Sequence, residues 1–342
     1  MYTLRLWDIT GTACLATLHD AAVKNWSNRV SSPGRFQFSL PASSTNIALL
    51  QSQLVVTLER RDEVGDDVPE WVGYLESHKK TDKAEHTAFC AGALQLFRKR
   101  KTLDDETFTG GGSDEAFDLL TDTNGDFDTG IVAGTGGVAA TANLKATGRK
   151  DLLAMWTDIA AATGAEFAVS FTLAALSLVR SLDFVPSMGT DKSASVTLRF
   201  RRDGDPGNNV EGLEEGEDGE PMATRVIGTS AAGGGLEYVY DDPLQSTYGL
   251  LVEEKAFNEA QDLATLTALT TAYGQQRANP ITDYQVAPIL AEKRVNTITG
   301  ERQSVGLQYG DLVPGDLVTC DFVTESGTVQ AVRRIAEVLV DV

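Results

Sequence analysis

Two blocks of the sequence share one order, a strand-like run followed by a polar turn and a returning strand. The first block runs from "QLVVTLE" through the acidic loop "DEVGDDVPE" to "WVGYLESHKK". The second enters a strand at "LVTCDF" and returns after "TESGT" through "VQAVRRIAEVLVDV". Alternating apolar and polar residues predict strands with one buried face, and a repeated block of this kind predicts two similar β-barrels in one chain.

Length and charge limit the classes of protein that fit these blocks. The chain has 342 residues, enough for roughly two or three domains of ordinary size. Its net charge of −20 repels phosphate backbones, which disfavours sequence-independent binding to nucleic acid. Two interpretations of the charge stay open: solubility alone, or an acidic surface that an anionic molecule passes without adsorbing.

We predict an α+β chain that is mainly β. Residues 1–105 are expected to form a first β-barrel domain and residues 106–185 an α/β insertion. Residues 186–342 are expected to form a second β-barrel domain with one helix. Within it, residues 205–221 predict an exposed loop, since their glycine and acidic content cannot bury enough apolar surface to become ordered.

Three helices are predicted from apolar spacing and capping residues. Ser113 fits the N-cap of a short helix whose first turn is acidic. A second helix spans about 149–163, with Gly164 placed to end it. A third spans about 254–273, ahead of the Asn279-Pro280 stop.

The sequence "VPGD" raises the question of a carboxylate site near the C-terminus. Pro314 and Gly315 fit the two central positions of a type II turn, where proline presets φ and glycine supplies a positive φ. Asp311 and Asp316 could pair as acid and base, but no apolar pocket that would separate their pKa values is evident. We therefore predict that Pro314, Gly315 and Asp316 are the structural turn of the second barrel.

Other patterns resemble sites only weakly. The acidic segment 122–128 alternates acids like a calcium loop, but its glycine is at 125 instead of 127, so an Asx-rich turn competes with a cation site. "GTGGVA", from Gly134, imitates a dinucleotide fingerprint without a surrounding βαβ unit, and a flexible loop is the preferred interpretation. Neither the three histidines nor the three cysteines have metal-ligand spacing. We expect no catalytic residue, no cofactor and no metal.

Targeting signals are also missing from the sequence pattern. The N-terminal stretch "MYTLRLWDIT" lacks the basic and apolar regions of a signal peptide, and synthesis in the cytoplasm is expected. The most apolar stretch, residues 167–179, is shorter than the ~20 residues of a membrane helix. We interpret it as buried strand and predict no membrane span.

The order of several segments resembles the tail-hub proteins of long-tailed bacteriophages, the family of tail-tip and baseplate hubs. The segments are, in order, "PGRFQFSLPASSTNIALLQSQLVVTLERR", "WVGYLES", "GRKDLLAMWTDIAAATGAEFAV", "LDFVPSMGTD", "NNVEG", "MATRVIGTS" and "YGDLVPGDLVTCDF". The long acidic loop and the glycine-rich 130s depart from the family.

The resemblance implies a non-enzymatic homotrimer at the tail tip of the virion. Two barrels per subunit would form a ring of approximate sixfold symmetry, which would join the hexameric tail tube or a distal tail protein to a trimeric spike or fibre. DNA would pass through the ring without specific binding. Two alternatives stay open: a host-surface (glycan) binding protein and a cell-wall hydrolase.

Overall fold

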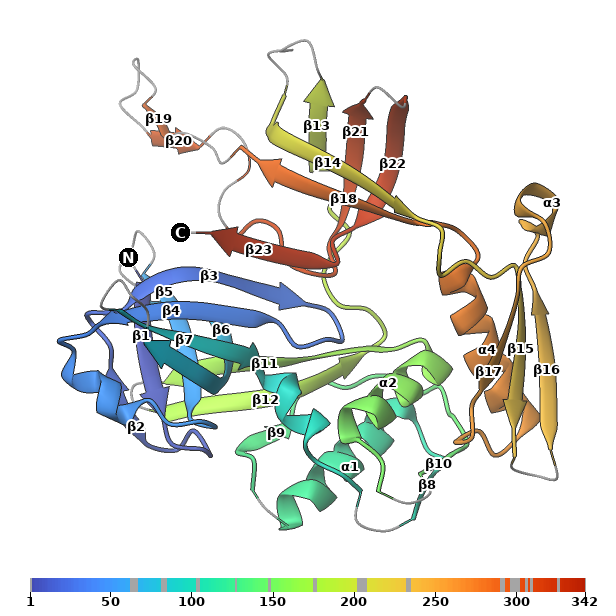
Figure 1. The fold of residues 1–342 in the computed structure, drawn as a ribbon, viewed down its shortest axis with the longest axis horizontal. Coiled ribbons are helices and arrows are strands. Elements are labelled where there is room, and N and C mark those ends of the chain that lie inside the picture. Colours follow the sequence, from blue (N-terminus) through green and yellow to red (C-terminus); the bar gives the residue numbers. More distant parts are fainter. Residues whose placement is uncertain are drawn as a thin grey trace.

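The computed structural model describes residues 2–61, 67–80, 85–102, 105–126, 128–146, 149–174, 177–201, 208–231, 235–289, 293–295, 302–304, 307, 310–324 and 327–341. Strands dominate these residues and four α-helices accompany them, which confirms the α+β, mainly β class. Four parts can be followed in Figure 1: a first sheet unit at lower left, a central unit with two helices, a side unit at right and a second sheet unit above.

The first sheet unit is an eight-stranded sheet in the order β2-β1-β5-β6-β7-β4-β3-β23. Its elements are β1 (Tyr2–Trp7), β2 (Cys14–Thr17), β3 (Ala22–Arg29), β4 (Arg35–Pro41), η1 (Thr45–Leu49), β5 (Val55–Arg61), β6 (Asp67–Lys80), β7 (Glu85–Gly92), η2 (Ala93–Arg98) and β23 (Glu337–Asp341). Alternating apolar residues of these strands, with Trp26, Phe36 and Trp71 among them, bury one face in a common core. In the described residues β2 and β23 are the two edges of this sheet, so no closed barrel is observed.

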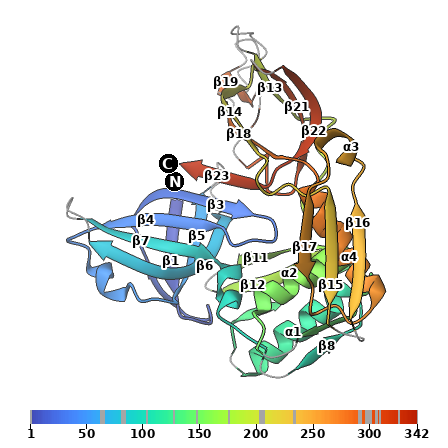
Figure 2. The same cartoon turned by 45° about the vertical axis from the view of Figure 1, so that its right-hand side comes forward.

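The last strand belongs to the first sheet and not to the sheets that precede it in sequence. β23 pairs antiparallel with β3, with Leu339 opposite Ser27. Figures 1 and 2 both show this strand leaving the second sheet unit, and both place the two chain ends near one another. The chain therefore returns to its starting sheet. The predicted boundaries at 105 and 185 stay a prediction.

The central unit contains two helices and two small sheets. Its elements are β8 (Glu106–Phe108), α1 (Gly112–Asp126), β9 (Ile131–Ala133), β10 (Leu144–Ala146), α2 (Leu152–Thr163), β11 (Glu166–Ala174) and β12 (Ser177–Val185). Asp151 caps α2 by accepting from the Leu153 amide, and Gly164 ends it in the left-handed region with φ 69°. Residues 167–174 and 177–179, predicted as buried strand, belong to the paired strands β11 and β12, but of the side chains described there only Phe167 and Leu178 are buried.

The second sheet unit combines a three-stranded sheet, β13-β21-β22, with a long two-stranded ribbon, β14-β18. Its strands are β13 (Thr197–Arg201), β14 (Val210–Asp218), β18 (Ile281–Pro288), β19 (Lys293–Val295), β20 (Arg302–Ser304), β21 (Leu317–Val323) and β22 (Thr328–Arg334). Val318, Cys320 and Phe322 of β21 pack in the core between the sheet and the ribbon. No closed barrel is seen in the described part of this unit.

The side unit is a three-stranded sheet covered on one face by a helix. Its elements are β15 (Arg225–Ser230), β16 (Leu236–Asp241), α3 (Gln245–Tyr248), β17 (Val252–Ala256) and α4 (Leu263–Arg277). The helix starts later than the predicted residue 254, because β17 pairs in parallel with β15 and Asp262 supplies the N-cap. Backbone pairing overrides the helical pattern of the preceding residues.

Residues 205–221 were predicted as an exposed loop, and this prediction is wrong for most of their length. Val210–Asp218 forms β14, which pairs antiparallel with β18, and Leu213 lies opposite Val286 in the core. Pairing with a distant strand satisfies the backbone even though the acidic side chains of β14 stay exposed. Residues 205–207 lie outside the described residues.

The acidic segment 122–128 was predicted as a loop, whereas α1 continues through Asp126. The Asn124 side chain stabilises the chain beyond the helix, since its oxygen accepts from the Thr129 amide and hydroxyl and its nitrogen donates to the Ile131 carbonyl. Residue 127 lies outside the described residues.

Ser113 lies inside α1 and is not its N-cap. Its hydroxyl donates to the Phe184 carbonyl and accepts from the amides of Gly137 and Val138. These bonds hold Gly137 and Val138 beside β12. Residues 134–140 form a loop, and the flexibility predicted for it stays a prediction.

A buried arginine joins the first sheet unit to the central unit. Arg180 of β12 is fully buried and donates to the Tyr74 hydroxyl at 2.5 Å. It also donates to the carbonyls of Thr10 and Thr129, each at 2.6 Å. Burial raises the pKa of Tyr74, although the guanidinium acts in the opposite direction. One cation thus links β6, the β1–β2 turn and the turn before β9.

Replacing this guanidinium tests whether it holds the two units together. Arg180→Met leaves three buried oxygens without their donor and is expected to lower the free energy of unfolding by roughly 3 kcal/mol. Tyr74→Phe removes one hydrogen bond and should cost about 1 kcal/mol. Urea unfolding of the full chain measures both. Equal stability of the two variants would contradict the proposed role.

Asp158 of α2 lies where the central unit meets the side unit. Burial raises its pKa to about 6, while Lys150 and Lys255 of the two units act against the shift. A carboxyl whose pKa is higher in the folded chain is destabilising once it ionises. This cost grows between the ordinary value of 3.8 and pH 6 and stays constant above that range.

Asp158→Asn should therefore stabilise the chain at pH 8 by about 2 kcal/mol and have little effect at pH 4. Asp118→Asn, on the exposed side of α1, controls for the loss of one negative charge. Thermal unfolding at both pH values measures the difference. A gain of the same size at pH 4 and pH 8 would show that ionisation of Asp158 is not its cause.

Candidate assembly surface

The predicted site residues form a tight turn at the start of β21. Gly315 has φ 99°, and the Asp316 amide donates to the Val313 carbonyl at 3.2 Å, the hydrogen bond of a β-turn. A methyl group on Gly315 would lie 2.6 Å from the Met188 carbonyl oxygen. The turn is therefore pressed against the linker that follows β12.

The Asp316 carboxylate is the centre of this contact. It is fully buried and accepts from the Thr190 amide at 2.8 Å and from the Val313 amide at 2.9 Å. Lys192 forms an ion pair with it at 2.7 Å. Burial raises the pKa of Asp316, but these hydrogen bonds and the Lys192 charge outweigh it and lower the pKa overall.

Asp311 and Asp316 have different roles in this turn. Asp311 is exposed and contributes its backbone carbonyl, which accepts from the Lys192 ammonium. A general acid needs a raised pKa, whereas that of Asp316 is lowered. The geometry is that of a structural joint between the linker and the second sheet unit.

Two histidines that are not adjacent in the sequence lie close together in the fold. His78 and His86 stack across β6 and β7 with ring centroids 6.2 Å apart. Within the described residues, no group of three or more His, Cys, Asp or Glu side chains is placed to hold a metal ion. Of the helices described, none is long and apolar enough to span a membrane.

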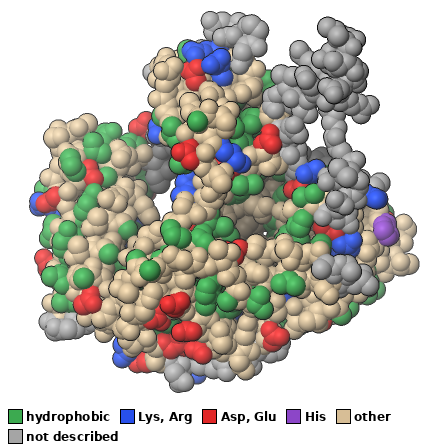
Figure 3. Space-filling model, turned by 180° about the vertical axis from the view of Figure 1, so that it is seen from behind, with side chains coloured by type: hydrophobic (Ala, Val, Ile, Leu, Met, Phe, Trp, Pro, Cys, Tyr) green, Lys and Arg blue, Asp and Glu red, His purple; other side chains and the backbone are tan. Residues whose placement is uncertain are grey.

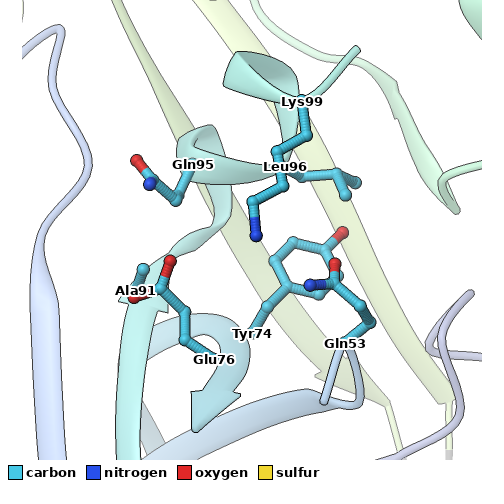
Figure 4. A pocket seen from close by; sticks show the side chains of 7 residues that line it. All are labelled: Gln53, Tyr74, Glu76, Ala91, Gln95, Leu96 and Lys99. Carbon is cyan, nitrogen blue, oxygen red and sulfur yellow. The ribbon is translucent and has the colours of Figure 1, made fainter.

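A narrow pocket lies beside η2, next to the Arg180 contact (Figure 4). It is lined by Gln53, Tyr74, Glu76, Ala91, Gln95, Leu96 and Lys99. Its free volume of about 10 Å³ holds no more than one water molecule. The pocket is therefore too small for an organic ligand.

A polar row on the first sheet was not recognised from the sequence. On β5, Thr57 and Glu59 point away from the core formed by Val56 and Leu58. Thr57 accepts from the Trp7 indole at 3.0 Å and donates to Glu59, which pairs with Arg5. Both Thr57 and Glu59 are fully buried.

The second sheet has a matching row. On β21, Thr319 and Asp321 point away from the core formed by Val318 and Cys320. Asp321 pairs with Arg199 at 3.2 Å and with Arg201, both on β13. The matching sequences, "VVTLE" at 55–59 and "LVTCD" at 317–321, are the signal that a comparison of the two blocks would have found.

The two rows differ in what covers them. The row on β21 lines a groove of about 430 Å³, formed by Thr197, Arg199, Thr319, Asp321, Gln330, Ala331 and Val332. Val332 is 50% exposed and the Arg199 side chain 43% exposed. Burial raises the pKa of Asp321, but the Gln330 hydrogen bond and the two arginines lower it overall. This face of the second sheet is open in the single chain.

The side unit carries a second uncovered surface. Five large apolar side chains near the end of its sheet are at least 39% exposed: Val239, Tyr248, Leu250, Leu251 and Val252. Seen from behind, apolar side chains reach the surface in several places, and the molecule is hollowed where the second sheet unit stands above the rest (Figure 3).

Comparison with known proteins relies on structure alone. No family model matches the chain, and no curated protein matches it in sequence. Prophage tail protein gp18 of Listeria monocytogenes is similar with 11% identity and a TM-score of 0.57, over 98% of this chain and 90% of that one.

A tail protein of Neisseria meningitidis is 14% identical with a TM-score of 0.60, over 99% of this chain and 91% of that one. The 43 kDa tail protein of prophage MuSo2 from Shewanella oneidensis is 13% identical with a TM-score of 0.58, over 99% and 93%. The chain has the fold of phage tail proteins. The resemblance predicted from the sequence is confirmed at this level, that of the fold.

In this tail-protein fold, the joint at Asp316 can be tested through stability. Asp316→Asn should lower the free energy of unfolding at pH 7 by roughly 3 kcal/mol, because Lys192 is left beside a neutral amide. Since the folded pKa is lowered, this contribution is present above the ordinary value of 3.8 and is lost as pH falls through the folded pKa.

Asp311→Asn is the matched control, because it leaves the backbone carbonyl that accepts from Lys192 in place. Urea unfolding at pH 7 and at pH 3 compares the two variants with the parent chain. We expect the loss for Asp316→Asn to shrink at pH 3. If Asp316→Asn lowers the free energy of unfolding at pH 7 no more than Asp311→Asn does, Asp316 does not form the structural joint.

Proposed function

We propose that this chain is a structural hub protein of a bacteriophage tail tip or baseplate, assembled as a homotrimeric ring. The observation that carries the proposal is the extent of the likeness: 98–99% of the chain matches 90% or more of each of three tail proteins. A fold shared over 90% or more of both chains favours a shared architectural role over a site grafted onto a common fold.

The two sheet units support the ring. Each has a central strand with an apolar face in a core and a Thr-x-acid row on the other face, paired with arginine from a neighbouring strand. We propose that each unit completes one barrel of the ring. Three chains then present six similar barrels to a hexameric tail tube or distal tail protein, and three identical faces to a spike or fibre.

Charge supports passage of DNA through such a ring. Three chains of net charge −20 each carry −60 before counterions. The ribbon β14-β18 adds a row of exposed acids, Glu214, Glu215, Glu217 and Asp218, on a paired backbone. An acidic surface repels the DNA backbone and opposes adsorption during ejection. The ring would act in the virion and would catalyse no reaction.

Mass photometry of the purified chain, alone and with the tail-tube protein of its phage, tests the proposal. We expect a species of three times the 36.6 kDa chain mass. A particle that stays monomeric in both conditions would contradict the trimeric hub.

The rival functions need separate measurements. A zymogram on host cell wall should show no cleared band, and a glycan array should show no specific binding. A cleared band would favour the hydrolase, and saturable glycan binding by a monomer would favour the host-surface protein.

A further inference from the structure

The open face of the β13-β21-β22 sheet carries a polar network that is only partly buried in the single chain. Asp321 pairs with Arg199 and Arg201 and accepts from Gln330. Thr197, Thr319 and Val332 line the same groove. Register places Arg199 opposite Asp321 and Thr319 opposite Val332, so these side chains share one face. The Asp321 side chain is 8% exposed, whereas Arg199 at the rim of the groove is 43% exposed.

In the first sheet, the corresponding face is covered. There the corresponding Thr57 and Glu59 are fully buried, and the Trp7 indole donates to Thr57. Trp7 also packs into the core shared with the central unit, so the cover comes from the same chain. The second sheet has the same row, but the groove above it is open in the single chain.

Charge favours an acidic occupant of the groove. Two arginines, Arg199 and Arg201, share the single carboxylate of Asp321, which leaves the rim with a surplus positive charge. The chain as a whole has a net charge of −20, so another copy of it presents a predominantly acidic surface. A basic rim around a half-exposed valine is complementary to such a surface.

We propose that this groove is the docking surface for a second copy of the chain, which covers the Arg199–Asp321 row as the chain itself covers the Arg5–Glu59 row. The proposal rests on the proposed homotrimer and names one of its surfaces. A C3 ring needs a heterologous contact, in which this groove meets a different surface of the next copy. Gln330 and Val332 become buried in that contact.

Substitutions at Val332 test the groove while leaving Arg199, Arg201 and Asp321 in place. Val332→Glu adds a negative charge facing an acidic neighbour and should weaken trimer formation at least ~10-fold in the dissociation constant. Val332→Lys changes size in a similar way with the opposite charge and should weaken it less. Val179→Glu, at a strand residue of the central unit that is 46% exposed, is the matched control and should assemble as the parent chain does.

Mass photometry over a dilution series gives the dissociation constants, and circular dichroism with thermal unfolding shows that each variant is folded. Two results would overturn the groove assignment and leave the homotrimer standing, provided that the parent chain forms a trimer. One is an unchanged dissociation constant for Val332→Glu, and the other is an equal weakening of the trimer by Val179→Glu. Normal assembly of Val332→Glu with loss of binding to another tail protein would assign the groove to that protein instead. A parent chain that never trimerises would overturn the proposed function itself.

Discussion

The placement of the second sheet unit depends on the pairing of β23 with β3, on the Arg334–Glu166 ion pair and on the buried carboxylate of Asp316. This carboxylate joins the linker after β12 to the first turn of β21 through Thr190, Lys192 and Val313. Gly315 lets the linker approach at a distance that a side chain would not permit. Arg180 makes the corresponding joint between the first sheet and the central unit. Both joints use buried charge held by several partners, which fixes geometry more than it adds stability.

Both sheet units carry a Thr-x-acid row paired with arginine, although the strand that supplies the arginine is antiparallel in the first sheet and parallel in the second. In the first sheet the row is buried and holds the chain together through Trp7, Thr57 and Glu59. In the second sheet the row lines an open groove, which suits it to contact between copies. In the proposed trimer, two sheet units per chain would supply the sixfold match and whole subunits the threefold one.

Local signals were sufficient where a single segment decides the structure. Apolar spacing and Gly164 predicted α2, and the proline–glycine pair predicted the turn before β21. Elsewhere, pairing with distant strands overrode these local signals. β14 has the composition of a loop and becomes a strand because β18, far along the chain, pairs with it. β23 joins the first sheet through β3, which no local pattern indicates. The Thr-x-acid rows can be found only by comparing the two blocks strand by strand.

We propose that three copies of this chain, each with two sheet units, form a ring at the end of a phage tail. An electron cryo-microscopy reconstruction of the tail tip of the particle that carries this chain tests it most directly. We expect three copies around the tail axis, with six sheet units alternating around the lumen. A tip in which this chain is peripheral, or in which only one of its sheet units contributes to the ring, would contradict the account.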